Sequence, residues 1–172
     1  KQNAEISKNV ITQSFGEFNL PEGKSLLSIG SEVGFATENF VDTNNLRESL
    51  VETDKKFLNV PFLWGGRSFF GIDDSGFVQL LYKVHGITLP RDPEQQALQG
   101  TARDFVEESE AGDLAFFEDA EGKIVHVGLV LSPFEIIHAS GKVRIDSLDF
   151  SGIYNAEQNK HTHKLRFVKT MI

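Results

Sequence analysis

Three residues far apart in the sequence, Asp74, His126 and His138, are of types that could activate a nucleophile or hold one in place. Asp74 lies in the segment GIDDSG, residues 71–76, at the predicted start of an apolar helix. The first turn of a helix carries unpaired N–H groups and the positive end of the helix dipole, so it lowers the pKa of a thiol. The position therefore suits a cysteine nucleophile, but the chain contains no cysteine and has an aspartate there.

The two histidines follow in segments that favour neighbouring strands. We expect His126 to reach the helix tip as a general base and His138 to hold the ring of His126 in the correct tautomer. The N–H groups of the helix would then form an oxyanion hole. A carboxylate is a poor nucleophile toward an amide, so Asp74 predicts a chain with almost no activity. We also expect its charge to favour the protonated forms of the two imidazoles.

The residues that precede His126 favour helices. One helix is predicted to begin near Asp42 or Thr43 and to stop before Pro61. A second carries an apolar stripe and ends at Gly86, and a short third one follows Pro93. The stripe consists of Phe77, Val78, Leu80, Leu81 and Val84.

The residues after Gly100 favour strands rich in β-branched and aromatic side chains. The predicted strands are Leu114 to Phe117, Ile124 to Leu131, Glu135 to Ala139, Lys142 to Leu148 and Leu165 to Val168. Helices followed by an antiparallel sheet predict an α+β fold with the N-terminal helices packed on the sheet. Residues 1–45 are predicted as a β-rich lead-in, and residues 46–172 as the main domain.

The composition excludes several classes of protein. A net charge of -8 disfavours nucleic acid as a partner. The absence of cysteine excludes disulfides and zinc-thiolate sites. The apolar runs are much shorter than the roughly 20 residues that span a bilayer, so no membrane insertion is predicted.

Six segments follow one another in a fixed order. They are PFLWGG (61–66), GIDDSGFVQLLY (71–82), LPRD (89–92), AGDLAFF (111–117), HVGLVL (126–131) and IHASGKVRID (137–146). Together they resemble the NlpC-type cell-wall peptidases of bacteria, which are papain-like cysteine hydrolases. Within that group they are most similar to the γ-D-glutamyl-L-diamino acid endopeptidases, which cut peptidoglycan stem peptides after D-Glu. The resemblance covers about residues 46–172 and implies a papain-like fold and no cofactor, and it leaves the location open between periplasm and cytoplasm.

The resemblance also implies roles for particular residues. The family's catalytic cysteine falls on Asp74, its base on His126 and its orienting residue on His138. Asp73 and Ser75 match the groups that help to hold the free amino end of an L-Ala-γ-D-Glu substrate. Trp64 lies in the glycine turn that borders the substrate groove, and Phe62 replaces a tyrosine whose hydroxyl approaches the substrate. Residues 1–45 resemble the tail of a Src-homology-3-like module.

Two other functions fit the same residues. A peptidoglycan-fragment binder would use the groove around Asp73, Ser75 and Trp64 without any reaction. A metal site would use Asp74 with the two histidines as a two-histidine, one-carboxylate triad, provided that their ligand atoms converge.

The residues also have structural interpretations. Asp73 and Asp74 suit the N-cap and first turn of a helix. Trp64 can be a buried aromatic residue in a glycine turn, and Arg91 can form a local ion pair with Asp92. An aspartate in place of the cysteine is explained by an inactivating substitution, by a natural binding-only homologue, or by a cysteine sulfinate, which has a similar shape.

Overall fold

The structure is a computed structural model that describes residues 7–10, 26–29, 32–37 and 46–172. In the first part it shows β1 (Ser7–Val10), β2 (Leu26–Ile29) and β3 (Glu32–Thr37), which form an antiparallel sheet in the order β1-β3-β2. These three strands lie within residues 1–45. The division of the chain into a lead-in and a main domain, and the likeness to a Src-homology-3-like module, stay predictions.

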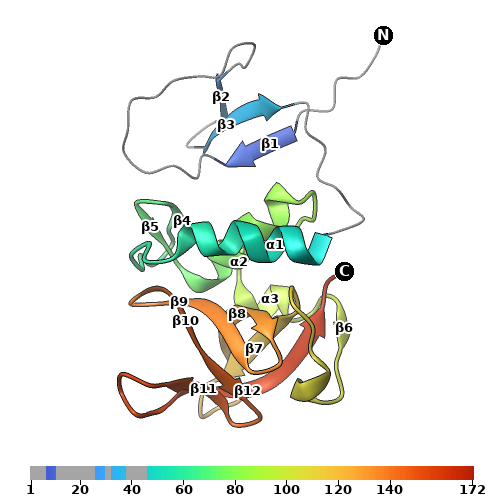
Figure 1. The fold of residues 1–172 in the computed structure, drawn as a ribbon, viewed down its shortest axis with the longest axis vertical. Coiled ribbons are helices and arrows are strands. Elements are labelled where there is room, and N and C mark those ends of the chain that lie inside the picture. The colour runs from blue at the N-terminus through green and yellow to red at the C-terminus, as the bar shows by residue number, and fades with distance from the viewer. Residues whose placement is uncertain (1–6, 11–25, 30–31, 38–45) are drawn as a thin grey trace.

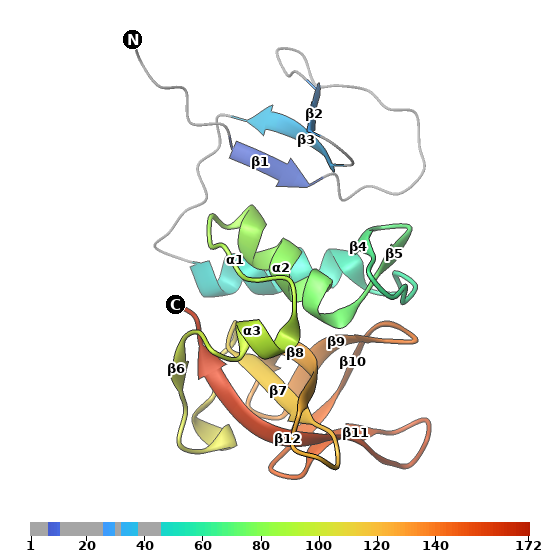
Figure 2. The ribbon, with the colours of Figure 1, turned by 180° about the vertical axis from the view of Figure 1, so that it is seen from behind.

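Helices form the layer between this small sheet and the main sheet (Figures 1 and 2). They are α1 (Leu46–Asp54), which a 3-10 turn η2 (Lys55–Phe57) extends, α2 (Asp74–Val84) and α3 (Pro93–Gln96). The first helix ends before Pro61, as predicted, whereas its expected start at residues 42–43 lies outside the described residues. A short hairpin of β4 (Arg67–Ser68) and β5 (Gly71–Ile72) precedes α2.

The start and end of α2 have clear local causes. Asp73 has extended backbone angles, and its side chain accepts a hydrogen bond from the N–H of Gly76 at 2.7 Å. It therefore caps one of the unpaired N–H groups of the first turn. At the other end Gly86 has a φ of +80°, a conformation in which glycine has no steric penalty.

The main sheet has seven strands in the order β11-β10-β9-β8-β7-β12-β6, and β11 also pairs with β12. All of these pairings are antiparallel. The sheet therefore closes on itself, which the sequence did not predict. Its strands are β6 (Thr101–Ala102), β7 (Leu114–Glu118), β8 (Ile124–Ser132), β9 (Glu135–Ser140), β10 (Lys142–Asp149), β11 (Gly152–Asn155) and β12 (Lys160–Thr170), and a 3-10 turn η3 (Val106–Glu108) lies between β6 and β7.

Side chains alternate between the two faces of the sheet, so the strands contribute to two apolar clusters. One cluster contains Leu114 and Phe116 with residues of α1 and α2, which confirms that the helices pack on the sheet. The other contains Ala115 and Phe117 with residues from β8 to β12 and fills the inside of the curved sheet. The predicted α+β class is confirmed. No helix of the described part is both long and apolar enough to cross a membrane.

Candidate active site

The structure brings Asp74 and His126 together at the N-terminus of α2. Oδ2 of Asp74 lies 3.1 Å from Nδ1 of His126 and accepts a hydrogen bond from the N–H of Val127 at 3.0 Å. Both side chains are buried. Burial by itself raises the pKa of the Asp74 carboxyl, but the hydrogen bond and charge of His126 and the nearby backbone N–H groups lower this pKa overall. The carboxylate is therefore charged at neutral pH.

A chain of hydrogen bonds continues from His126 into the sheet. Nε2 of His126 lies 2.9 Å from Nδ1 of His138, and Nε2 of His138 lies 3.0 Å from Oδ2 of Asp146. Arg144 donates two hydrogen bonds to the same Asp146 carboxylate. The pKa of Asp146 is below its ordinary value, because the bonds from His138 and Arg144 outweigh its burial. His138 thus lies behind His126, and its role in orienting the His126 ring stays a prediction.

The Asp146 carboxylate at the end of this chain fixes the positions of the protons. Nε2 of His138 must donate to Asp146, so its Nδ1 accepts from Nε2 of His126. Nδ1 of His126 faces Oδ2 of the Asp74 carboxylate at 3.1 Å. We therefore assign one proton to Nε2 of His126 and a single proton, on Nε2, to His138. The Asp74 carboxylate carries the same negative charge beside this ring as a thiolate would.

The expectation that both imidazoles would favour their protonated forms is wrong for His138. Its pKa is lowered to about 4, because burial and the positive charge of His126 outweigh the opposing effect of Asp146. His138 is 1% exposed, and this side chain is therefore neutral at physiological pH.

The strand register explains why the two histidines meet. Phe117 of β7 is paired with His126, and Gly128 of β8 is paired with His138. Directly paired residues project from the same face, so both rings lie on the face of Phe117, inside the curved sheet. A Cβ atom on Gly128 would lie 2.9 Å from Cβ of His138. Glycine at this position leaves the space that the side chains of Ile136 and His138 occupy.

A third histidine, His163 of β12, lies against this pair and was not found from the sequence. Its ring stacks on His126 with centroids 4.1 Å apart, and it lies 5.5 Å from the ring of His138. Nδ1 of His163 is 2.9 Å from the hydroxyl of Thr162. Burial and the neighbouring rings of His126 and His138 lower the pKa of His163 to about 3.

Asp73 and Ser75 are buried on either side of Asp74, and Arg91 connects them. Arg91 donates to Oγ of Ser75 at 2.8 Å and to Oδ2 of Asp73. The interpretation of Arg91 as the local partner of Asp92 is therefore wrong. This link could not be predicted from the sequence, because Asp73 lies 18 residues from Arg91 along the chain.

The segment with Phe62 and Trp64 forms the exposed rim beside α2. Trp64 is 85% exposed, so the interpretation of this residue as a buried aromatic is wrong. Phe62 is 36% exposed, and its N–H donates to the carbonyl of Gly141 at 3.0 Å. A Cβ atom on Gly66 would lie 2.4 Å from the carbonyl oxygen of Gly71. The glycine in this turn thus lets two backbone segments pass closely.

The charge of Arg91 is expected to stabilise the buried Asp73 carboxylate. Arg91→Gln should lower the free energy of unfolding by about 2 kcal/mol, because a buried charge loses a charge-assisted hydrogen bond. Chemical denaturation measures this loss. Arg166→Gln is the matched control, since Arg166 is 57% exposed and its partner Glu118 keeps a second ion pair with Lys164 at 2.7 Å, and it should change stability by less than about 0.5 kcal/mol. Equal losses in the two variants would contradict the role given to Arg91.

The metal site considered from Asp74, His126 and His138 is not compatible with this geometry. Asp74 lies at Nδ1 of His126, and His138 lies at Nε2 on the other side of the same ring. These three residues therefore cannot converge on one ion.

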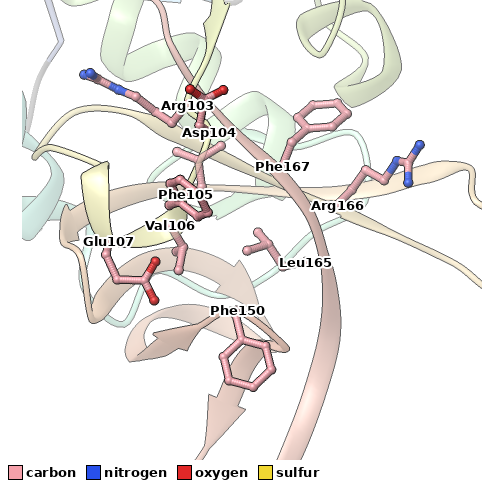
Figure 3. A pocket seen from close by; sticks show the side chains of 10 residues that line it. Arg103, Asp104, Phe105, Val106, Glu107, Phe150, Leu165, Arg166 and Phe167 are labelled. Atoms are coloured by element: carbon pink, nitrogen blue, oxygen red, sulfur yellow. The ribbon is translucent and has the colours of Figure 1, made fainter.

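A separate pocket of about 240 Å³ lies on another part of the molecule (Figure 3). Side chains of the 103–107 segment, of β12 and of the turn after β10 surround it. It shares no residue with the site at α2. Its lining consists of Arg103, Asp104, Phe105, Val106, Glu107, Phe150, Leu165, Arg166, Phe167 and Val168.

Comparisons with known proteins identify the family of this chain. The NlpC/P60 family model matches residues 59–165. A γ-D-glutamyl-L-lysine dipeptidyl-peptidase of Bacillus cereus is 38% identical over 123 residues, which are 70% of this chain and 36% of that protein. A protein of the same name from Bacillus subtilis is 40% identical over 94 residues, 54% of this chain and 31% of the relative. The chain thus spans about a third of the length of these curated relatives.

A solved structure shows the same fold. The crystal structure of an NlpC/P60 family protein from Bacillus cereus has a TM-score of 0.66 and 26% sequence identity. The match covers 90% of this chain and 52% of that one. Since the family model matches more than half of the sequence, this chain belongs to the NlpC/P60 family.

Proposed function

We propose that this chain is a peptidoglycan stem-peptide domain that keeps the groove and histidines of a cysteine peptidase for γ-D-Glu-L-diamino acid bonds, but lacks the nucleophile. It would bind peptides that begin with L-Ala-γ-D-Glu and would not cleave them. The relatives named for γ-D-glutamyl-L-lysine cleavage support the choice of peptide.

The observation that carries the proposal is the contact between Asp74 and His126. A carboxylate that is 6% exposed lies 3.1 Å from the ring nitrogen that would activate a thiol. The negative charge of Asp74 therefore lies where a catalytic thiolate would carry its charge. An aspartate here could at most attack an amide as a weak nucleophile, so hydrolysis would be lost while the electrostatics of the site are kept.

The free amino end of the peptide is proposed to bind beside Asp73 and Ser75. A carboxylate can accept about four hydrogen bonds. Asp73 accepts three from described residues, namely from the N–H groups of Gly65 and Gly76 and from Arg91. One acceptor position on its Oδ1 atom is thus left for an amine. Trp64 is proposed to cover the peptide from the exposed rim.

Calorimetry with L-Ala-γ-D-Glu-L-Lys tests this function. We expect saturable binding of this peptide without release of lysine. The N-acetylated peptide should bind at least about tenfold more weakly, because its blocked amino group loses the charge-assisted hydrogen bond to Asp73. Trp64→Ala should also weaken binding, whereas Phe134→Ala should not, since Phe134 is an exposed aromatic at the opposite end of β8.

Three results would contradict the proposal. They are turnover by the unchanged chain, no binding of the stem peptide, and equal binding of the free and acetylated peptides. Mass spectrometry of the peptide after prolonged incubation distinguishes binding from slow cleavage.

The second candidate function is a protein adapted to binding alone, in which the histidines no longer form working machinery. The short hydrogen-bond chain from His126 to Asp146 favours the first candidate, since a binding groove has no need of an oriented general base.

A further inference from the structure

We propose that His126, His138 and His163 form a binding site for one divalent zinc-class ion. The three residues lie on β8, β9 and β12, which the closed sheet brings together. One ring nitrogen from each lies within 4.8 Å of those of the other two. This site differs from the triad with Asp74, whose members cannot converge.

The outer nitrogen of each ring already has an oxygen partner. Asp74 holds Nδ1 of His126 at 3.1 Å, and Asp146 holds Nε2 of His138 at 3.0 Å. The hydroxyl of Thr162 lies 2.9 Å from Nδ1 of His163. Histidines that bind metal usually have their second nitrogen fixed in this way, by a carboxylate or another oxygen.

The remaining nitrogens are Nε2 of His126, Nδ1 of His138 and Nε2 of His163. Three imidazoles and an open fourth position are a ligand set that suits Zn²⁺. His163 is only partly buried, so the cluster can be reached from solvent through this side chain.

Binding requires a defined local rearrangement. Tetrahedral Zn²⁺, with nitrogens about 2.0–2.1 Å from the ion, keeps them roughly 3.4 Å apart. Nε2 of His126 and Nδ1 of His138 are 2.9 Å apart and share a hydrogen bond. The ion replaces the proton on Nε2 of His126, which is released to water. The ring of His163 must also rotate out of its stacked position, because a ligand nitrogen points its lone pair at the metal in the ring plane.

Titration of the chain with ZnCl₂ tests the site, using protein without a histidine tag. We expect one zinc ion per chain to remain after dialysis, release of a proton on binding, and a rise in the melting temperature. Co²⁺ should give the strong visible absorption of a tetrahedral complex. A chain that keeps no stoichiometric zinc would overturn the proposal.

His163→Asn is expected to weaken zinc binding by at least about 100-fold, since loss of an outer partner alone costs about 10- to 100-fold. His161→Asn is the matched control on the same strand, because His161 is exposed and pairs with Asp149 at 2.9 Å. Unchanged affinity in His163→Asn, or equal losses in His161→Asn and His163→Asn, would overturn the site. Stem-peptide binding measured with a chelator present tests the proposed function separately.

Discussion

Replacement of Asp74 by cysteine is expected to convert a chain without detectable turnover into a peptidase, with a gain of about 10⁴- to 10⁶-fold. The reason lies in what already surrounds position 74. His126 lies 3.1 Å from the carboxylate, Val127 donates an N–H to it, and Asp74 itself is the first residue of α2. Each of these groups would stabilise a thiolate as it now stabilises the carboxylate.

The measurement is the release of L-lysine from L-Ala-γ-D-Glu-L-Lys, followed by mass spectrometry. The chain has no cysteine of its own, so alkylation by iodoacetamide reports on the introduced thiol alone. Rapid alkylation at neutral pH is expected, because a thiolate beside a charged imidazole and a helix N-terminus has a low pKa.

Two controls separate the nucleophile from other effects of the substitution. Asp74→Asn removes the charge and supplies no thiol, so it should stay inactive. Asp74→Cys combined with His126→Ala should lose most of the gain, because the proton acceptor is gone. The thiol of Asp74→Cys could alkylate rapidly while every stem peptide remains intact. That result would show that the residues around position 74 do not form a working peptidase site, and it would favour the binding-only function.

Much of the fold could be predicted because its causes are local. The cap at Asp73, the apolar stripe of α2 and the left-handed Gly86 are all visible in short segments. The alternating strands β7 to β10 were also predicted close to their observed bounds. The closure of the sheet was not predicted, since the pairing of β11 with β12 depends on the twist of the whole sheet rather than on any segment.

Part of the candidate site could also be predicted, because its causes too are visible in short segments. Asp74, His126 and His138 were found because each lies in a recognisable segment, and the structure places them together. His163 was missed because the last strand was predicted only from Leu165, whereas β12 begins at Lys160. The alternation of His161, His163 and Leu165 could have extended that strand. The polar residues of β12 stay in the strand because they pair with strands distant in the sequence. Strand propensities of single residues do not account for such pairing.

A buried acid outside the site leads to the second large prediction, which concerns stability. Asp54 is the last residue of α1 and is 0% exposed. Neither of its carboxyl oxygens has a hydrogen-bond partner among the described residues. Burial raises the pKa of Asp54 to about 8, and the charge of Lys55 opposes this only in part. The negative end of the α1 dipole acts in the same direction as burial.

The sign of the effect on stability follows from linkage. In the unfolded chain an aspartic acid has a pKa of about 3.9, whereas in the folded chain Asp54 keeps its proton until about pH 8. The folded state therefore binds more protons between these values, and the contribution of Asp54 to stability falls as the pH rises from about 4 to about 8. Each unit of pKa difference is worth about 1.4 kcal/mol, so several kcal/mol are lost by the upper end.

Asp54→Asn should remove this loss, because the amide has nearly the same shape and no charge at any pH. We expect the variant to be several kcal/mol more stable than the unchanged chain above pH 8 and nearly equal to it at pH 4. Urea denaturation at a series of pH values measures the difference, in which the titrations of all other groups cancel. The comparison of the two chains at pH 4 is the internal control. A difference between the two chains that stays constant from pH 4 to pH 9 would show that Asp54 is charged in the folded protein or is hydrated there, and that its burial does not set the pH dependence.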